Sequence, residues 1–163
     1  MVKSLSMVKD ATPEKMKLVG EWAVEHNLWK KRREDVIARL TNHKSQGAQV
    51  YIASSVIEPM IEPFARRIGV QTIGTPVEYS NGQVRVAGDL VAQERKIEQV
   101  LTHLSAVLGS KVQRIDFAYG DTEQDIPLLE QADHPVAVYP DEKLKKYAVT
   151  RGWEILGGPP SYG

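Results

Sequence analysis

Short apolar runs alternate with amphipathic segments over most of this chain, from Gly47 to Leu156. Strands buried on both faces of a parallel sheet are near-continuous apolar runs, and the crossovers between them are usually helices. The candidate strands are 48–55, 70–74, 112–120, 134–140 and 153–156. This order predicts an α/β fold, a Rossmann-like parallel sheet flanked by helices.

The segments between these runs have helical signals. Apolar residues recur at helical spacing, and glycines follow the expected ends, which predicts helices over 58–68, about 91–108, from about 123, and 142–150. The stretch VEYSNGQVRV differs, because two alternating segments flank Asn81-Gly82. That dipeptide favours a type I′ turn, so a β-hairpin is expected there.

The N-terminal part of the chain reads as helical. Thr12-Pro13 is a helix start, with a hydroxyl cap and a proline in the first turn. The helix is expected to reach about Asn27, with Met16, Val19, Trp22 and Ala23 facing inward. A second helix is expected over about 34–45. We therefore divide the chain into a helical segment, 1–45, and an α/β core, 46–163.

Composition excludes several function classes. The chain has 163 residues, no cysteine, and 21 basic against 21 acidic side chains. Thiolate catalysis and cysteine-based zinc sites are excluded, and no charge excess indicates nucleic acid or a membrane surface as a partner. The sequence has neither a signal-peptide core nor a run of about 18 apolar residues. A cytoplasmic protein is expected.

Polar side chains stand where two predicted strands end. Ser54-Ser55 close the run 48–55, and Gly120 and Asp121 close 112–120, with Asp125 opening the next helix. Ligands of parallel sheets bind beyond the carboxyl ends of the strands. Two carboxylates there suit Mg²⁺, and a serine at a helix start suits phosphate. Each feature also has a simpler interpretation, as a helix cap or a first-turn acid.

Lys96 follows on a later helix, and alone it would be read as a surface lysine. The order is a strand ending in serine, then a lysine, then a strand ending in GDxxxD. This order resembles that of the haloacid dehalogenase-like (HAD) superfamily, in particular its phosphoserine-phosphatase-like branch. Similar stretches are IASSVIEPMIEPFARRIGV, GTPVEYSNGQVRVAG and AYGDTEQDIPLLEQADHPVAVYPDEKLKKYAVTRGWEIL. The likeness extends over about Gly47 to Leu156.

The resemblance implies a Mg²⁺-dependent phosphomonoester hydrolase acting on a small phosphorylated metabolite. Ser54, with Ser55 beside it, would bind phosphoryl oxygens. Lys96 would neutralise the phosphoryl group and the attacking carboxylate. Asp121 would hold Mg²⁺, and Asp125 would hold it directly or through water. Such a division suits phosphoryl transfer, which needs positioning and charge neutralisation.

The attacking aspartate is not found at its expected motif. The family carries it in DxDx(T/V) at the end of its first strand, and this sequence has no such motif. Residues 1–45 resemble the end of the helical cap that the branch inserts after that motif. One local candidate is Asp10, but its flanking residues Lys3, Ser4 and Lys9 suit a buried strand poorly. Little or no turnover is expected from this chain alone.

The lost motif would also remove a central strand, because in this family that strand lies between those ending at Ser54 and Gly120. The two strands could close up, residues 1–9 or another chain could fill the place, or the chain could be a fragment. An open apolar edge invites pairing with another copy. The alternative function is therefore a non-catalytic remnant that binds Mg²⁺ and phosphate, or that oligomerises through its sheet. A receiver-like regulatory domain fits less well.

Overall fold

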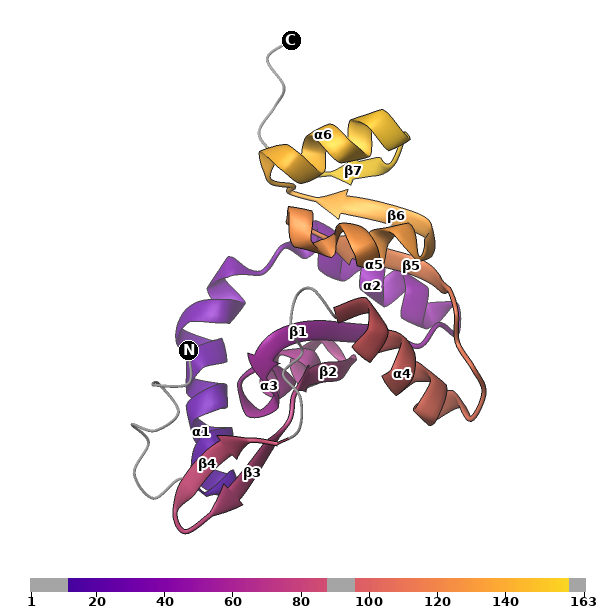
Figure 1. The fold of residues 1–163 in the computed structure, drawn as a ribbon. Coiled ribbons are helices and arrows are strands. Elements are labelled where there is room, and N and C mark those ends of the chain that lie inside the picture. Colours follow the sequence, from indigo (N-terminus) through magenta and orange to yellow (C-terminus); the bar gives the residue numbers. More distant parts are fainter. Residues whose placement is uncertain (1–11, 88–95, 159–163) are drawn as a thin grey trace. The chain divides into compact units, whose positions relative to one another are not determined.

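The computed structural model describes residues 12–87 and 96–158 (Figure 1). The chain divides into two compact units, Met1–Ala92 and Gln93–Gly163, and each is described by itself. The predicted boundary at residues 45 and 46 falls inside the first unit and stays a prediction. Among the described residues, no helix is both long and apolar enough to cross a membrane.

The strands of the first unit form a parallel pair and a hairpin. The parallel pair is β1 (Tyr51–Ile57) with β2 (Gln71–Thr75), and the antiparallel pair is β3 (Val77–Ser80) with β4 (Gln83–Val86). The turn residues Asn81 and Gly82 have φ values of 50° and 70°. Positive φ at both central residues is what a type I′ turn requires, so the predicted hairpin is confirmed.

The helices of the first unit begin close to their predicted starts. They are α1 (Pro13–Ala23), continued by the π-helical η2 (Val24–Leu28) and the 3₁₀-helical η3 (Trp29–Lys31), then α2 (Glu34–Ser45) and α3 (Glu58–Ile68). The Thr12 hydroxyl caps α1 by accepting from the Lys15 amide at 3.2 Å. Gly69 ends α3 in the left-handed region at φ 75°, as its place after the apolar pattern predicted.

Gly20 sets the packing of α1 on α3. A Cβ at this position would lie 2.1 Å from the Pro59 carbonyl oxygen and 3.1 Å from Pro63 Cγ. The two helices therefore approach at a point where only glycine fits. Ion pairs lie beside this contact, and one of them joins Arg66 of α3 to Glu21 of α1 at 3.0 Å.

Two of the ion pairs join α3 to α1 and η2, and a third lies within α3. Arg66 lies 3.0 Å from Glu21 and 3.7 Å from Glu62, and Arg67 lies 2.9 Å from Glu25. All of these side chains are substantially exposed, so the ion pairs add little to stability. Apolar packing at the Gly20 contact therefore does more to join the two helices.

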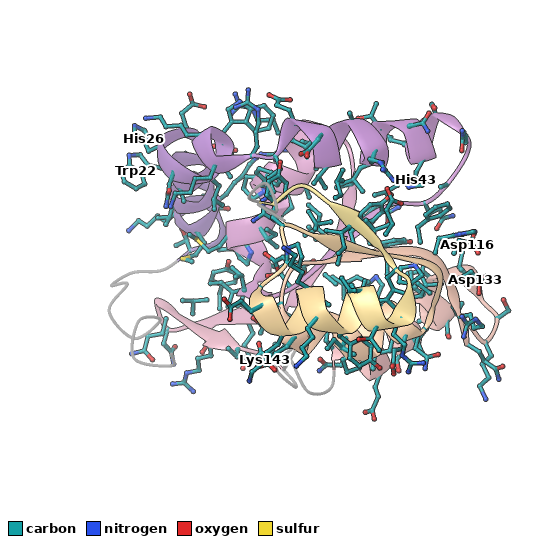
Figure 2. All side chains as sticks on the ribbon, turned by 90° about the horizontal axis from the view of Figure 1, so that it is seen from above. Trp22, His26, His43, Asp116, Asp133 and Lys143 are labelled. Atoms are coloured by element: carbon teal, nitrogen blue, oxygen red, sulfur yellow. The ribbon has the colours of Figure 1, made fainter. Side chains whose placement is uncertain are left out.

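The face of α1 that points inward differs from the prediction. Met16, Gly20 and Val24 are buried, whereas Val19 is 42% and Trp22 63% exposed. The prediction of Val19 and Trp22 as inward residues was wrong because it followed apolar residues at helical spacing. The close contact with α3 instead turns the line through the small Gly20 inward. Trp22 instead stacks on His26, with ring centroids 4.5 Å apart, and both are labelled in Figure 2.

A small apolar cluster joins α1 to the hairpin. Met16 and Val84 are buried together, and Ile57, Val77 and Tyr79 pack against them. Burial raises the pKa of the Tyr79 hydroxyl above its usual value, and the negative charge of Glu14 adds to the effect. Both causes follow from the position of the hairpin beside the first turn of α1.

The second unit contains a three-stranded parallel sheet in the order β5-β6-β7. Its strands are β5 (Ile115–Gly120), β6 (Ala132–Val138) and β7 (Glu154–Leu156). Its helices are α4 (Lys96–Leu108), the 3₁₀-helical η5 (Glu123–Asp125), α5 (Ile126–Glu130) and α6 (Glu142–Arg151). The first residues of the helix predicted over 91–108 lie outside the described part of the chain.

The core of this unit lies between the sheet and α5 and α6. Its buried members are small or aliphatic, and they are Ala118, Leu129, Ala132, Ala137, Leu144 and Ala148. The central strand β6 buries three successive residues, Val136, Ala137 and Val138. Successive residues point to opposite faces of a sheet, so β6 is covered on both faces, as its apolar sequence predicted.

The predicted α/β fold with parallel strands and helices is confirmed. In the described residues the strands form two parallel ladders, β1-β2 and β5-β6-β7. The strands that end the two ladders, β1 and β5, are those between which the sequence predicted a lost strand. The three outcomes considered above for the place between these strands stay predictions.

We expect Gly20→Ala to lower the free energy of unfolding of the first unit. The added methyl group must displace the backbone of α3, a cost of about 1–3 kcal/mol that the better helix propensity of alanine only partly offsets. Urea denaturation followed by circular dichroism measures the change. Val19→Ile is the matched control, because it adds one carbon on the exposed side of α1; equal stability of Gly20→Ala and the control would contradict the packing described.

Candidate functional site

The Asp125 carboxylate is the centre of a polar cluster at the carboxyl end of β5. Its Oδ1 accepts from Lys96 Nζ at 2.9 Å, and its Oδ2 accepts from the backbone amides of Asp121 and Thr122 at 3.1 Å and 3.3 Å. The side chains of Lys96 and Asp125 are 14% and 9% exposed. A nearly buried carboxylate is thus paired with a cation and with two N–H donors, as burial of its charge requires.

Gly120 makes room for this carboxylate. A Cβ on Gly120 would lie 2.6 Å from Asp125 Cβ and 3.1 Å from its Oδ2. Gly120 is the last residue of β5 and is not among the glycines with positive φ, so no turn requires it to be glycine. Its function is therefore to let the Asp125 side chain lie against the end of the strand.

Asp121 lies at the exposed rim of the same strand end. It directly follows β5, and its backbone N–H is fixed by Asp125 Oδ2. Its carbonyl oxygen accepts from the Asp141 amide at 3.0 Å. The backbone of Asp121 is therefore held on both sides, and its side chain stands at the sheet edge where ligands of parallel sheets bind.

The serine segment differs from its prediction. The sequence placed Ser54 and Ser55 at a strand end and at the start of a helix, but β1 continues to Ile57 and α3 begins at Glu58. The register with β2 shifts between Ala53 and Ile57, so the serines lie in a bulge. Extra residues in a bulge leave the ladder, which explains why the apolar pattern breaks before the strand does.

Contacts within the first unit hold the bulge. Ser54 Oγ accepts from the Val56 amide at 3.1 Å, and the buried Thr75 hydroxyl donates to the Ser55 carbonyl oxygen at 2.8 Å. Ser54 thus belongs to the first unit, and the cluster around Asp125 belongs to the second. The structure brings together Lys96, Asp121 and Asp125; that Ser54 and Ser55 join them stays a prediction.

The residues of the cluster fit a magnesium ion in one particular way. In the described part of the chain, no three His, Asp or Glu side chains gather as a metal site. Mg²⁺ needs fewer, because it keeps several waters and binds through one or two carboxylates plus substrate phosphate. Both Oδ2 lone pairs of Asp125 are used by amides, and Oδ1 faces Lys96. The donor set therefore fits one direct carboxylate, from Asp121.

Asp141 is the residue of this region that the sequence analysis missed. Its side chain caps α6 by accepting from the Leu144 amide at 2.8 Å and also accepts from the Glu123 amide at 3.1 Å. An aspartate between Pro140 and a helix start is a recognisable cap signal. The second bond could not be read from the sequence, because it depends on the adjacency of β5 and β6. Asp10 lies outside the described residues.

Comparison with known proteins identifies the family. The model of the haloacid dehalogenase-like hydrolases matches residues 2–130. The chain belongs to this family. It is 30% identical over 121 residues to a histidinol-phosphatase of Neisseria meningitidis, covering 71% of this chain and 54% of that protein. It is 28% identical over 161 residues to the phosphoserine phosphatase SerB1 of Mycobacterium tuberculosis, covering 94% of this chain and 50% of that protein.

Solved structures show the same fold. A protein of unknown function from Bordetella pertussis Tohama I matches with a TM-score of 0.82 and 24% identity, over 94% of this chain and 70% of that one. A phospho-aspartyl intermediate analogue of phosphoserine phosphatase matches with a TM-score of 0.58 and 19% identity, over 94% and 68%. The predicted likeness to the phosphoserine-phosphatase-like branch is confirmed. The chain spans about half the length of the curated relatives that it matches.

We expect Asp125→Asn to destabilise the second unit by about 2–3 kcal/mol, because it leaves the nearly buried Lys96 ammonium without its counter-charge. Urea denaturation at neutral pH measures the loss. The control is Glu123→Gln in the neighbouring pair with Lys143, which is 3.2 Å long with side chains 45% and 75% exposed. That exposed pair should contribute at most about 0.5 kcal/mol. Similar losses for both variants would show that the Asp125 pair is not effectively buried.

Proposed function

We propose that this chain is a Mg²⁺-dependent phosphomonoester hydrolase domain of the HAD family. The observation that carries the proposal is the 2.9 Å pair between Lys96 and Asp125 beside Asp121, at the carboxyl end of β5. It combines a fixed cation with an exposed carboxylate that can hold a second cation. Stabilising a phosphoryl group during transfer requires this kind of concentrated positive charge.

The geometry supports different roles for the two aspartates. Asp121 is proposed to bind Mg²⁺ directly. Asp125 is proposed to orient Lys96 and to reach the ion only through water, because three hydrogen bonds already occupy its oxygens. When bound, Mg²⁺ would supply charge neutralisation and orient the phosphoryl oxygens. Lys96, held by Asp125, would present its ammonium to the same phosphoryl group.

Ser54 is proposed to donate a hydrogen bond to a phosphoryl oxygen. Its Oγ accepts from the Val56 amide at 3.1 Å, which fixes the oxygen within the bulge. A hydroxyl can accept and donate at the same time, so this bond is compatible with donation to phosphate. Ser55 is proposed to contribute through its backbone, whose carbonyl oxygen is held by the buried Thr75.

The nucleophile is the part of the proposal that the described residues do not supply. The sequence contains no DxDx(T/V), the motif that carries the attacking aspartate in the family. We therefore propose that turnover by this chain alone is low. A nucleophile and its partners act as a unit, so the remaining groups cannot replace it. Asp10 stays a candidate.

The names of relatives support a small phosphorylated substrate. One similar protein is named a histidinol-phosphatase and another a phosphoserine phosphatase. Balanced charge, with 21 basic and 21 acidic side chains, favours a small metabolite over nucleic acid. Action in the cytoplasm stays a prediction.

We expect Mg²⁺ together with inorganic phosphate to raise the thermal stability of the chain, and Asp121→Asn to abolish the rise. A ligand that binds only the folded state stabilises it by about 2.7 kcal/mol at a concentration of 100 times its Kd. Thermal denaturation with and without both ions measures the effect. Hydrolysis of an aryl phosphate, assayed in parallel, should be slow and Mg²⁺-dependent.

The matched control is Asp116→Asn. Asp116 is exposed on β5, labelled in Figure 2, and four residues before Gly120 along the strand. Asp116→Asn removes one negative charge, as Asp121→Asn does, but at a position away from the strand end. Stabilisation by Mg²⁺ should therefore persist in this variant. Persistence in Asp121→Asn as well would refute the metal assignment. Aryl phosphate hydrolysis that disappears in Asp10→Asn would identify Asp10 as the nucleophile and contradict the expected low turnover.

A second candidate function is a non-catalytic domain that oligomerises through its sheets. The observation that favours it is the strand order, because β1 and β5 each end a ladder among the described residues. Parallel ladders are normally covered or extended at such ends. Another copy of the chain could extend either ladder while the cluster around Asp125 binds Mg²⁺ and phosphate.

If the chain associates with a second copy through its sheets, we expect its mass in solution to be about twice the 18.2 kDa of one chain. Size-exclusion chromatography with light scattering, over about 10–200 μM, measures it, because weak association depends on concentration. A single-chain mass throughout this range would reject the oligomeric candidate and leave the hydrolase proposal untouched.

A further inference from the structure

Asp141 connects the start of α6 to the segment that follows β5. Its backbone N–H donates to the Asp121 carbonyl oxygen at 3.0 Å, and its carbonyl oxygen accepts from the Lys145 amide at 2.9 Å. Its side chain accepts from the Leu144 amide at 2.8 Å and from the Glu123 amide at 3.1 Å. One residue thus starts α6 and also contacts the segment that follows β5.

The contacts of Asp141 with that segment lie on the C-terminal side of the Asp121 side chain along the backbone. One fixes the carbonyl oxygen of Asp121, and the other fixes the amide of Glu123, two residues later. Asp125 Oδ2 fixes the Asp121 amide, on the other side of that side chain, and the Thr122 amide. Asp125 and Asp141 therefore hold the Asp121 backbone from its two sides.

We propose that Asp141 is a positioning residue that sets the orientation of Asp121 for metal binding. The inference rests on the proposed function, in which Asp121 is the direct Mg²⁺ ligand. A metal ligand at an exposed rim loses affinity when its loop must be ordered on binding, because the ordering entropy opposes binding. Asp141 orders the loop beforehand by joining it to the start of α6.

A second link between the same elements provides a comparison. Lys143 of α6, labelled in Figure 2, pairs with Glu123 at 3.2 Å, and its side chain is 75% exposed. A pair of this kind between long exposed side chains restrains a backbone weakly. Asp141 instead has a short side chain, and its bonds go directly to backbone groups. Removing the Asp141 bonds should therefore disorder the Asp121 segment, whereas removing the Lys143–Glu123 pair should not.

The test uses Asp141→Ser in the full chain. Serine is as good a helix cap as aspartate, so it can retain the bond to the Leu144 amide. Its single oxygen cannot also reach Glu123, so the variant removes the bridge and keeps the cap. Lys143→Ala is the matched control, because it removes the exposed link alone.

Two readouts come from amide NMR spectra. Titration with MgCl₂, followed at the Gly120, Asp121 and Thr122 amides, should give a Kd about fivefold higher in Asp141→Ser and unchanged in Lys143→Ala. Hydrogen exchange of the Glu123 amide without metal should be about fivefold faster in Asp141→Ser only. A fivefold change corresponds to about 1 kcal/mol. The thermal midpoint should stay close to that of the unmodified chain.

The outcomes separate this inference from the function on which it rests. Equal Mg²⁺ affinity in Asp141→Ser and the unmodified chain, or equal weakening in Lys143→Ala, overturns the positioning role. If the unmodified chain binds no Mg²⁺, the proposed metal site fails, and exchange at Glu123 still decides whether Asp141 holds the loop. If Asp141→Ser unfolds, Asp141→Asn replaces it: the two bonds use different carboxylate oxygens, and the NH₂ group that replaces one of them cannot accept from its amide, so its Kd or its exchange must change.

Discussion

The nearly buried charge of Asp125 is the constraint on which the candidate site depends. A carboxylate that loses water must recover its solvation from the protein, and here Lys96 supplies a charge and two backbone amides supply donors. Those amides belong to Asp121 and Thr122, so the same carboxylate that holds Lys96 also fixes the loop of the proposed metal ligand. One interaction therefore sets the positions of both cationic groups that the proposed chemistry needs.

Close approach at a glycine makes the principal contact possible in each unit. Gly120 leaves space for the Asp125 side chain, and Gly20 lets α1 meet α3 at the Pro59 carbonyl. In the sequence, a glycine at either position gives no sign of the group that packs against it. Their importance comes from what packs against them, and a Cβ at either position would collide with a group that cannot move alone. Small residues thus determine the geometry around larger polar and apolar partners.

The sequence predicted what depends on local signals. Helix starts followed from caps such as Thr12, the hairpin followed from Asn81-Gly82, and the parallel strands followed from apolar runs. It failed where a partner decides the outcome. The inward face of α1 depends on α3, and the bulge at Ser54 depends on the register of β1 against β2. The order of Ser54, Lys96, Asp121 and Asp125 still predicted the family, because motif order does not require exact strand ends.

Three of the proposed site residues lie in one unit, and this has a chemical consequence. Lys96, Asp121 and Asp125 all belong to Gln93–Gly163, together with Asp141. The bonds that orient them are made within that unit, from β5, η5 and the start of α6. The groups proposed to neutralise charge are therefore oriented by this unit's own residues. The proposed metal and phosphate binding therefore depends on bonds within this unit, which is why binding and hydrolysis must be measured separately.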